Sequence, residues 1–223
     1  MSALADRLHS VRAGIEDAAR DAGRDPGGIT TIVVTKFQPV SLIRELAALG
    51  VRDVGENRHQ EAQAKAAELG DLGLRWHFVG QLQSKKARQV RAYASAIHSV
   101  DRESLVDALR SEEASVDCFV QVNLTDDPGR GGVAPDALET LVEKVLETPG
   151  LELRGLMAVA PLGEPARPAF ANVRTMSERV RRLAPEATSL SMGMSHDYRD
   201  AILEGATHLR IGTAITGNRP TGG

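Results

Sequence analysis

Apolar and polar positions along the chain follow two alternating spacings. From Leu4 to Ala18 apolar residues recur at helical spacing, and Gly23 with Pro26 ends that segment. The next segment, residues 30–36, is a β-branched run typical of a buried strand. Helical and strand-like stretches then alternate as far as residue 211. This alternation predicts an α/β fold in which helices connect parallel strands.

The pattern predicts eight strands and eight helices. The strands are expected at 30–36, at Val54-Gly55, and at 75–79, 96–100, 117–123, 153–159, 188–192 and 208–211. After the leading helix, helices are expected at 40–49, 59–69, 85–93, 102–114 and 135–146, around Phe170 to Leu183, and at 195–204. This count favours a single (β/α)8 TIM-type barrel with an extra N-terminal helix over an open doubly wound sheet. A Rossmann fold would need a glycine-rich turn after an early strand, where Lys36-Phe37-Gln38-Pro39 stands instead.

We expect one domain over residues 1–223, with the leading helix in 1–25 and a frayed tail at 218–223. The formal net charge of −3 argues against a nucleic-acid surface, which needs a basic face. The single cysteine, Cys118, excludes a disulfide framework and fits a reducing compartment. No apolar run approaches the ~18 residues of a membrane span, and the N-terminus has no secretory h-region. These features predict a cytoplasmic protein that binds neither nucleic acid nor a membrane.

In a barrel of this type, functional side chains lie at the C-terminal ends of the strands. Lys36 closes the most apolar strand, and it is one of five lysines among 27 basic residues. An amine held at the barrel mouth is disfavoured as an ammonium and becomes a nucleophile toward a carbonyl. The alternative is a solvated lysine that simply ends a strand. The six histidines show no paired metal spacing, so we expect no metal site.

Two loops after the last two expected strands carry glycine and hydroxyl groups. One is Ser191-Met192-Gly193-Met194-Ser195, in which Ser195 is expected to be a helix N-cap; the other is Arg210-Ile211-Gly212-Thr213-Ala214. Glycine permits close backbone approach, and phosphate sites in these barrels typically use the loops after strands seven and eight. An amine after strand one and a phosphate site after strands seven and eight suggest a phosphorylated aldehyde or ketone as ligand.

Several motifs, taken in order, resemble one known family. They are Val34-Thr35-Lys36, Gly55-Glu56-Asn57 with Gln60-Glu61, Trp76-His77-Phe78-Val79-Gly80 with Leu82-Gln83 and Lys86, Arg154-Gly155-Leu156-Met157-Ala158, and the two loops above. Together they resemble the pyridoxal phosphate homeostasis protein (YggS/PROSC) family over nearly the whole chain. The expected barrel also resembles the N-terminal domain of alanine racemase and the barrel of eukaryotic-type ornithine decarboxylase.

The resemblance implies pyridoxal 5′-phosphate (PLP) as cofactor, held by Lys36 as a Schiff base. It implies that Ser195, Gly212 and Thr213 hold the phosphate and that Arg210 faces the pyridine nitrogen. Further cofactor-binding positions implied by the motifs are Asn57, His77 and Met192. The family role that follows is intracellular PLP homeostasis or delivery to apo PLP-dependent enzymes.

An arginine opposite the pyridine nitrogen does not readily give up a proton, so the ring would be a poor electron sink. We therefore expect little or no turnover of amino acids, and no residue is assigned as certainly catalytic. Alanine racemase draws a tyrosine base from a partner's C-terminal domain, and the absence of such a domain here favours a monomer.

Three other functions remain open at this point. A PLP-dependent amino-acid racemase or decarboxylase would need a second acid/base, for which Tyr198 or His77 are the candidates. A Schiff-base aldolase acting on a sugar phosphate would use the same amine and phosphate loops. An interaction module would use the barrel as a scaffold alone.

Overall fold

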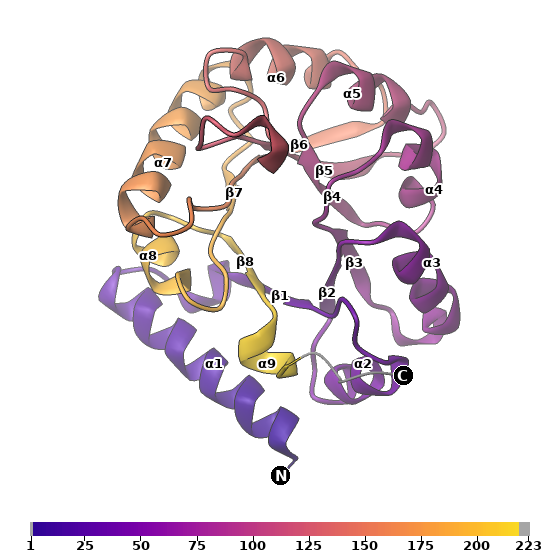
Figure 1. Ribbon diagram of the computed structural model, residues 1–223, viewed down its shortest axis with the longest axis vertical. Helices are drawn as coiled ribbons and strands as arrows, with labels where there is room; N and C mark the ends of the chain where they lie inside the picture. Colours follow the sequence, from indigo (N-terminus) through magenta and orange to yellow (C-terminus); the bar gives the residue numbers. More distant parts are fainter. Residues whose placement is uncertain (1, 219–223) are drawn as a thin grey trace.

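A computed structural model of the protein describes residues 2–218, except for the side chain of Pro128. Eight parallel strands pair in the order β1-β2-β3-β4-β5-β6-β7-β8 and close into one barrel. Helices surround the barrel, and α1 lies along its outside next to α8 and α9 (Figure 1). The TIM-type architecture predicted from the sequence is confirmed.

The elements alternate along the chain as expected. The strands are β1 (Thr30–Val34), β2 (Asp53–Glu56), β3 (Arg75–Phe78), β4 (Ala96–Val100), β5 (Val116–Gln121), β6 (Leu151–Met157), β7 (Ser189–Ser191) and β8 (His208–Ile211). The α-helices are α1 (Ala3–Asp21), α2 (Val40–Ala48), α3 (His59–Glu68), α4 (Ala87–Arg91), α5 (Glu103–Leu109), α6 (Leu138–Leu146), α7 (Ala166–Leu183), α8 (Tyr198–Leu203) and α9 (Thr213–Thr216).

Some elements are shorter than the sequence predicted. The strand expected at 30–36 ends at Val34, because the chain turns at Phe37, whose φ is 64°. The helix expected at 102–114 ends at Leu109, and the one expected at 85–93 is a 3₁₀ turn, Ser84–Lys86, followed by α4. The tail expected at 218–223 lies outside the described residues, apart from Asn218. The short helix α9 was not predicted.

The barrel closes through β1, which pairs with β2 on one side and with β8 on the other. In this register Val33 is opposite both Val54 of β2 and Ile211 of β8. The C-terminal ends of β8, β1 and β2 are therefore neighbours, although β8 comes from the far end of the chain.

Strand alternation divides the core into two regions. Side chains that face the helices, such as Val33, Val54 and Leu209, form one large hydrophobic core. The apolar cluster inside the barrel contains Phe119 and Met157 with Ala96. Barrels of this type usually fill their interior with branched aliphatic residues, whereas this interior also holds the buried polar side chains of His77, His98 and Ser191.

Helix α1 covers α8 and α9. Its apolar stripe, which includes Leu8 and Ile15, is buried, and Ser2 caps its first turn by accepting a hydrogen bond from the Ala5 N–H. Arg7 Nε donates to the Ile215 carbonyl of α9 at 2.7 Å. The leading helix thus supports the segment that follows β8.

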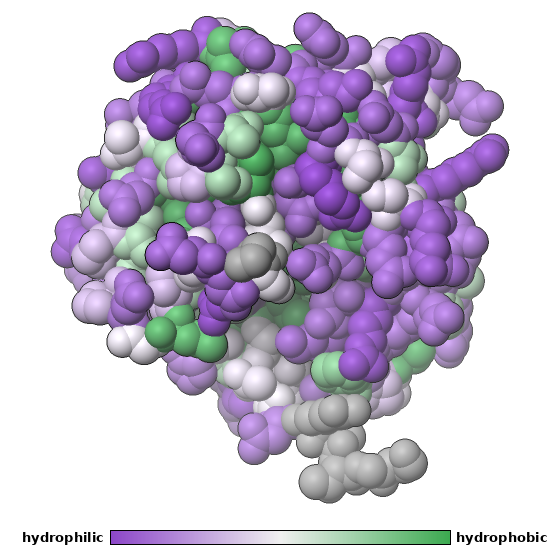
Figure 2. Space-filling model, turned by 45° about the horizontal axis from the view of Figure 1, so that its top comes forward, coloured by the Kyte–Doolittle hydropathy of each residue, from purple (hydrophilic) through white to green (hydrophobic). Residues whose placement is uncertain are grey.

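Figure 2 shows hydrophilic residues over most of one face, with hydrophobic residues visible mainly in recesses between them. Cys118 is fully buried in the barrel wall, and burial raises the pKa of its thiol to about 12. Among residues 2–218, no helix is long and apolar enough to cross a membrane.

Candidate functional site

Lys36 lies at the C-terminal end of β1, at the barrel mouth. Ile32 and Val34 face the interior, since a Cβ built on Gly55 of the neighbouring strand would lie 3.0 Å from Ile32 Cγ2 and 3.4 Å from Val34 Cγ2. Lys36 follows Val34 by two residues, in the turn that begins where β1 ends, and its side chain is exposed. The structure therefore places an accessible amine at the mouth.

A buried hydrogen-bonded cluster stabilises the backbone of the turn at Lys36. Lys65 Nζ of α3 donates to the Thr35 carbonyl at 2.8 Å, to Glu56 Oε1 at 2.8 Å and to Glu61 Oε1 at 2.6 Å. Glu61 Oε1 also accepts from the Phe37 N–H at 2.6 Å. The backbone on both sides of Lys36 is thus hydrogen-bonded to one cluster, which we call the Lys65 cluster (Thr35, Glu56, Glu61 and Lys65).

Burial raises the pKa of Glu56, and the hydrogen bonds from Lys65 and Thr35 oppose this shift. Sequence reasoning did not assign a role to any member of the Lys65 cluster. The i,i+4 spacing of Glu61 and Lys65 was a readable signal for an ion pair on a helix. This spacing gave no indication that the pair would lie against the backbone that follows β1, largely shielded from solvent.

The two loops predicted to hold phosphate lie on the next strands around the mouth. Gly212 follows β8 and lies against β1, since a Cβ on it would be 3.7 Å from Val34 Cβ. Ser195, after β7, accepts a hydrogen bond at Oγ from the Ala214 N–H at 3.3 Å, which joins the two loops. Thr213 is exposed between them. Ser195, Gly212 and Thr213 are therefore brought together beside Lys36.

The prediction that Ser195 is a helix N-cap is wrong. Helix α8 begins three residues later, and its N-cap is Asp197. The carboxylate of Asp197 accepts a hydrogen bond from the Met194 N–H at 2.5 Å, which stabilises the turn before the helix. The Ser195 hydroxyl is left to contact α9.

Arg210 lies inside the barrel near the mouth and is 5% exposed. Its Nη1 donates to Ser191 Oγ at 2.8 Å and its Nη2 to the Ala158 carbonyl at 2.9 Å. Burial lowers its pKa to about 10, so it remains a cation at neutral pH. Among the described residues, no carboxylate forms an ion pair with it. A buried guanidinium of this kind can still donate to a ligand.

The structure separates two of the predicted residues from this group. The ring of His77 is buried in the barrel interior, with Nε2 at 2.9 Å from Asp53 Oδ1 and Nδ1 at 2.9 Å from His98 Nε2. Met192 is fully buried in the hydrophobic core between strands and helices. His77 therefore belongs to an interior hydrogen-bond network, and Met192 to the packing of the barrel wall.

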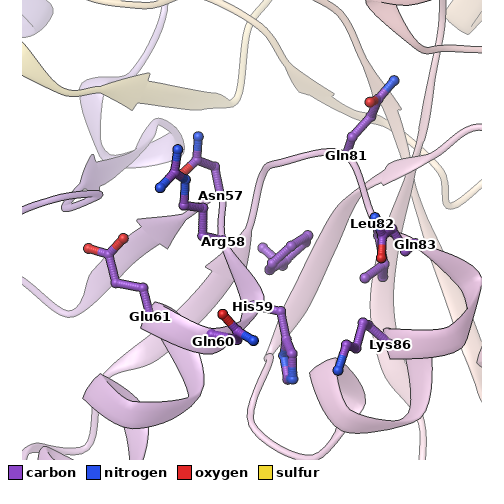
Figure 3. A pocket seen from close by; sticks show the side chains of 10 residues that line it. Asn57, Arg58, His59, Gln60, Glu61, Gln81, Leu82, Gln83 and Lys86 are labelled. Carbon is purple, nitrogen blue, oxygen red and sulfur yellow. The ribbon is translucent and has the colours of Figure 1, made fainter.

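Asn57 follows β2 and borders an open cavity of about 480 Å³. In Figure 3, residues from Asn57 to Glu61 line one side of this cavity, and residues from Gln81 to Lys86 line the other. Asn57 Oδ1 is buried and has no hydrogen-bond partner among the described residues. The amide oxygen thus has a hydrogen-bonding capacity that no described residue uses.

The geometry assembles complementary groups on four consecutive strands, β7, β8, β1 and β2. An accessible amine is flanked by a buried cation and by two loops that present hydroxyls and a glycine backbone. Such a set can form an imine with a carbonyl compound and hold an anionic group at a fixed distance from it.

Known proteins resemble this chain in sequence over most of its length. Residues 27–220 match the family described as "Alanine racemase, N-terminal domain". A pyridoxal phosphate homeostasis protein of Pseudomonas aeruginosa is 42% identical, covering 100% of this chain and 98% of the relative. The Escherichia coli protein of that name is 39% identical and covers 98% of each.

Solved structures agree with this placement. PipY of Synechococcus elongatus, with PLP bound, has a TM-score of 0.84 and 38% identity, covering 96% of this chain and 100% of that one. An alanine racemase from Corynebacterium glutamicum shares the fold alone, with a TM-score of 0.72, 15% identity and coverage of 97% of this chain and 63% of that one. The chain belongs to the pyridoxal phosphate homeostasis protein family.

Proposed function

We propose that this protein binds PLP at the barrel mouth, with Lys36 as the Schiff-base residue, and serves intracellular PLP homeostasis. The observation that carries the proposal is the placement of Lys36 between Asn57 on one side and Arg210, Gly212 and Thr213 on the other. The PLP-bound structure of PipY, at 38% identity, supports the choice of ligand.

The residues present fit this cofactor. The Arg210 guanidinium is buried without a carboxylate partner among the described residues, and a pyridine nitrogen is an acceptor suited to it. The hydroxyls of Ser195 and Thr213 and the backbone at Gly212 form a cradle for a phosphate. When bound, PLP supplies an aldehyde carbon for the Lys36 amine and a ring that can accept electrons.

The chain's own residues limit what such a ring could do. Arg210 remains a hydrogen-bond donor at neutral pH, so a nitrogen facing it stays unprotonated and the ring accepts electrons weakly. The Tyr198 hydroxyl lies against Gly14 of α1, and Tyr93 Oη lies 3.5 Å from His59 Nδ1. His77 is held between Asp53 and His98. The candidate acid/base residues are thus directed elsewhere, which favours holding and delivering the cofactor over turning over amino acids.

The near-visible absorption spectrum of the protein with PLP tests this proposal. We expect a Schiff-base band that is lost in Lys36→Ala and kept in Lys85→Ala, which removes another exposed lysine near the mouth. A band that persists in Lys36→Ala would overturn the assignment of Lys36.

The same PLP-loaded protein distinguishes delivery of PLP from turnover of amino acids. We expect a cytoplasmic monomer that activates an apo PLP-dependent enzyme and leaves the D/L ratio of common amino acids unchanged. Rapid D/L interconversion, lost with Lys36→Ala, would instead establish the racemase alternative.

A further inference from the structure

A continuous chain of polar side chains crosses the barrel interior from its N-terminal end to Arg210. Arg75 Nε donates to Asp53 Oδ1 at 2.7 Å and Arg75 Nη2 to Asp53 Oδ2 at 2.5 Å, where β2 and β3 begin. The successive contacts above Asp53 are His77 Nε2 to Asp53 Oδ1 at 2.9 Å, His98 Nε2 to His77 Nδ1 at 2.9 Å, Ser191 Oγ to His98 Nδ1 at 2.8 Å, and Arg210 Nη1 to Ser191 Oγ at 2.8 Å. We call Asp53, His77, His98 and Ser191 the interior chain.

With both histidine rings neutral, the two ends determine the direction of every hydrogen bond in the interior chain. Arg210 can only donate. Although burial alone would raise the pKa of Asp53, hydrogen bonds from His77 and Arg75 lower it to about 2, so this carboxylate only accepts. Each residue between them must therefore accept from the Arg210 side and donate toward Asp53.

This direction assigns the tautomers of both buried histidines. His77 must carry its proton on Nε2 and accept at Nδ1, and His98 must do the same. The Ser191 hydroxyl then donates to His98 Nδ1 and accepts from Arg210. Four hydrogen bonds with one direction link the Asp53 carboxylate at one end of the barrel to the Arg210 guanidinium at the other.

This direction holds for neutral rings, because an imidazolium at either position would make the Ser191 hydroxyl accept from both His98 and Arg210. The groups that face His77 are Asp53, Arg75, His98 and His208, and those around His98 are His77, His208, Arg210 and the stacked ring of Phe119. Burial, with nearby Arg210, holds the pKa of His98 well below its usual range. The surroundings of His98 thus favour the neutral ring that the interior chain requires.

We propose that the interior chain is a positioning relay for Arg210: it fixes the guanidinium and couples the charge of Asp53, at the closed end of the barrel, to the group that faces the ligand. The part of this inference that concerns the ligand rests on the proposed function. The tautomers and hydrogen-bond directions are properties of the protein alone and are tested without any cofactor.

The first test is ¹⁵N NMR of histidine side chains in the cofactor-free, full-length protein at pH 7. We expect neutral His77 and His98, both protonated on Nε2, assigned with His77→Gln and His98→Gln. In Ser191→Ala the His98 Nδ1 signal should shift, because its donor is lost, while Ser189→Ala on the same strand should leave it unchanged. A protonated ring, or an Nδ1-protonated tautomer of either histidine, would overturn the relay.

The second test uses PLP. Ser191→Ala and Asp53→Asn should weaken PLP binding about tenfold, the effect of losing one hydrogen bond to a charged group, and should shift the pH midpoint of the absorption band. Ser189→Ala should change neither. If the wild type shows no band, the proposed function fails, and with it the ligand end of the relay, whatever the tautomers. If the band forms with reversed tautomers, the relay alone fails.

Discussion

Lys65 is a buried cation that holds two carboxylates next to the backbone of Lys36. It is 6% exposed, Glu56 is 1% exposed, and Glu61 is half-buried. Replacing a buried ion pair with apolar groups can be neutral, but removing one partner leaves the other charge without compensation. The Lys65 cluster is therefore sensitive to the loss of its cation.

We expect Lys65→Met to lower the free energy of unfolding by about 3–5 kcal/mol, because it leaves Glu56 and Glu61 without a counter-charge. Burial already raises the pKa of Glu56, so in the variant this carboxyl gains stability by protonating. The loss should thus be larger at pH 8 than at pH 5. Urea unfolding at both pH values measures it.

The matched control is Lys144→Met, which removes a lysine from an exposed ion pair with Asp107. This change should have little effect, since exposed pairs contribute little to stability. Equal losses in the two variants would show that the burial of the Lys65 cluster has no special energetic role.

At the scale of elements, polar residues on neighbouring strands share the barrel interior. The His98 and Phe119 rings stack with centroids 4.3 Å apart, and the Phe119 and His208 rings meet edge-on at 5.1 Å. Burial is the main cause that lowers the pKa of His208 to about 4, with Arg210 adding to the shift and Asp53 opposing it. The interior therefore favours neutral histidine.

The buried His208 ring should make the stability of the barrel sensitive to mild acid. A histidine whose pKa falls on folding, from 6.5 to about 4, stabilises the protein fully above pH 6.5 and loses that contribution as the pH falls to 4. The contribution of His208 is at most about 3 kcal/mol. Unfolding free energies at pH 7 and pH 4.5 should differ less in His208→Gln than in the wild type. An unchanged pH dependence in that variant would contradict the prediction.

The sequence was sufficient to predict the strand-helix alternation, because buried strands and amphipathic helices carry different apolar spacings. It also predicted that Lys36, Gly212 and Thr213 lie at the same end of the barrel, since barrel topology places the C-terminal ends of the strands at one face. It could not predict the interior chain: alternation indicates that Asp53, His77 and His98 face inward but not which atoms meet. That pairing depends on strand register, which only the folded barrel defines.

Element ends were predicted least well. The sequence suggested that Ser195 starts a helix, whereas the N-cap position is taken by Asp197, whose carboxylate accepts from the Met194 N–H in the preceding turn. Met192 appeared in a motif with functional neighbours, yet it faces the helices. Local motif composition thus indicated where the site is but not which face each side chain takes.

At the scale of the whole molecule, the proposed site joins strands from both ends of the chain. Residues on β7, β8, β1 and β2 surround it, and these strands include the pair that closes the barrel. A ligand bound there would contact both sides of that closure. Binding should therefore stabilise the complete barrel rather than one local segment.

We expect PLP at 100 times its dissociation constant to raise the free energy of unfolding by about 2.7 kcal/mol. Lys36→Ala should lose most of this gain at the same PLP concentration, while Lys85→Ala should keep it. Thermal unfolding followed by circular dichroism measures the effect. A gain that is equal in Lys36→Ala and the wild type would indicate binding elsewhere on the molecule.

The pairing of β1 with β8 also bears on protein synthesis. The ribosome makes Lys36 well before Arg210 and Gly212, which follow on the paired strand β8. A stalled or truncated polypeptide would carry the reactive amine without the guanidinium and the loops that hold a ligand beside it. Cofactor capture would thus be confined to chains whose translation has passed the eighth strand.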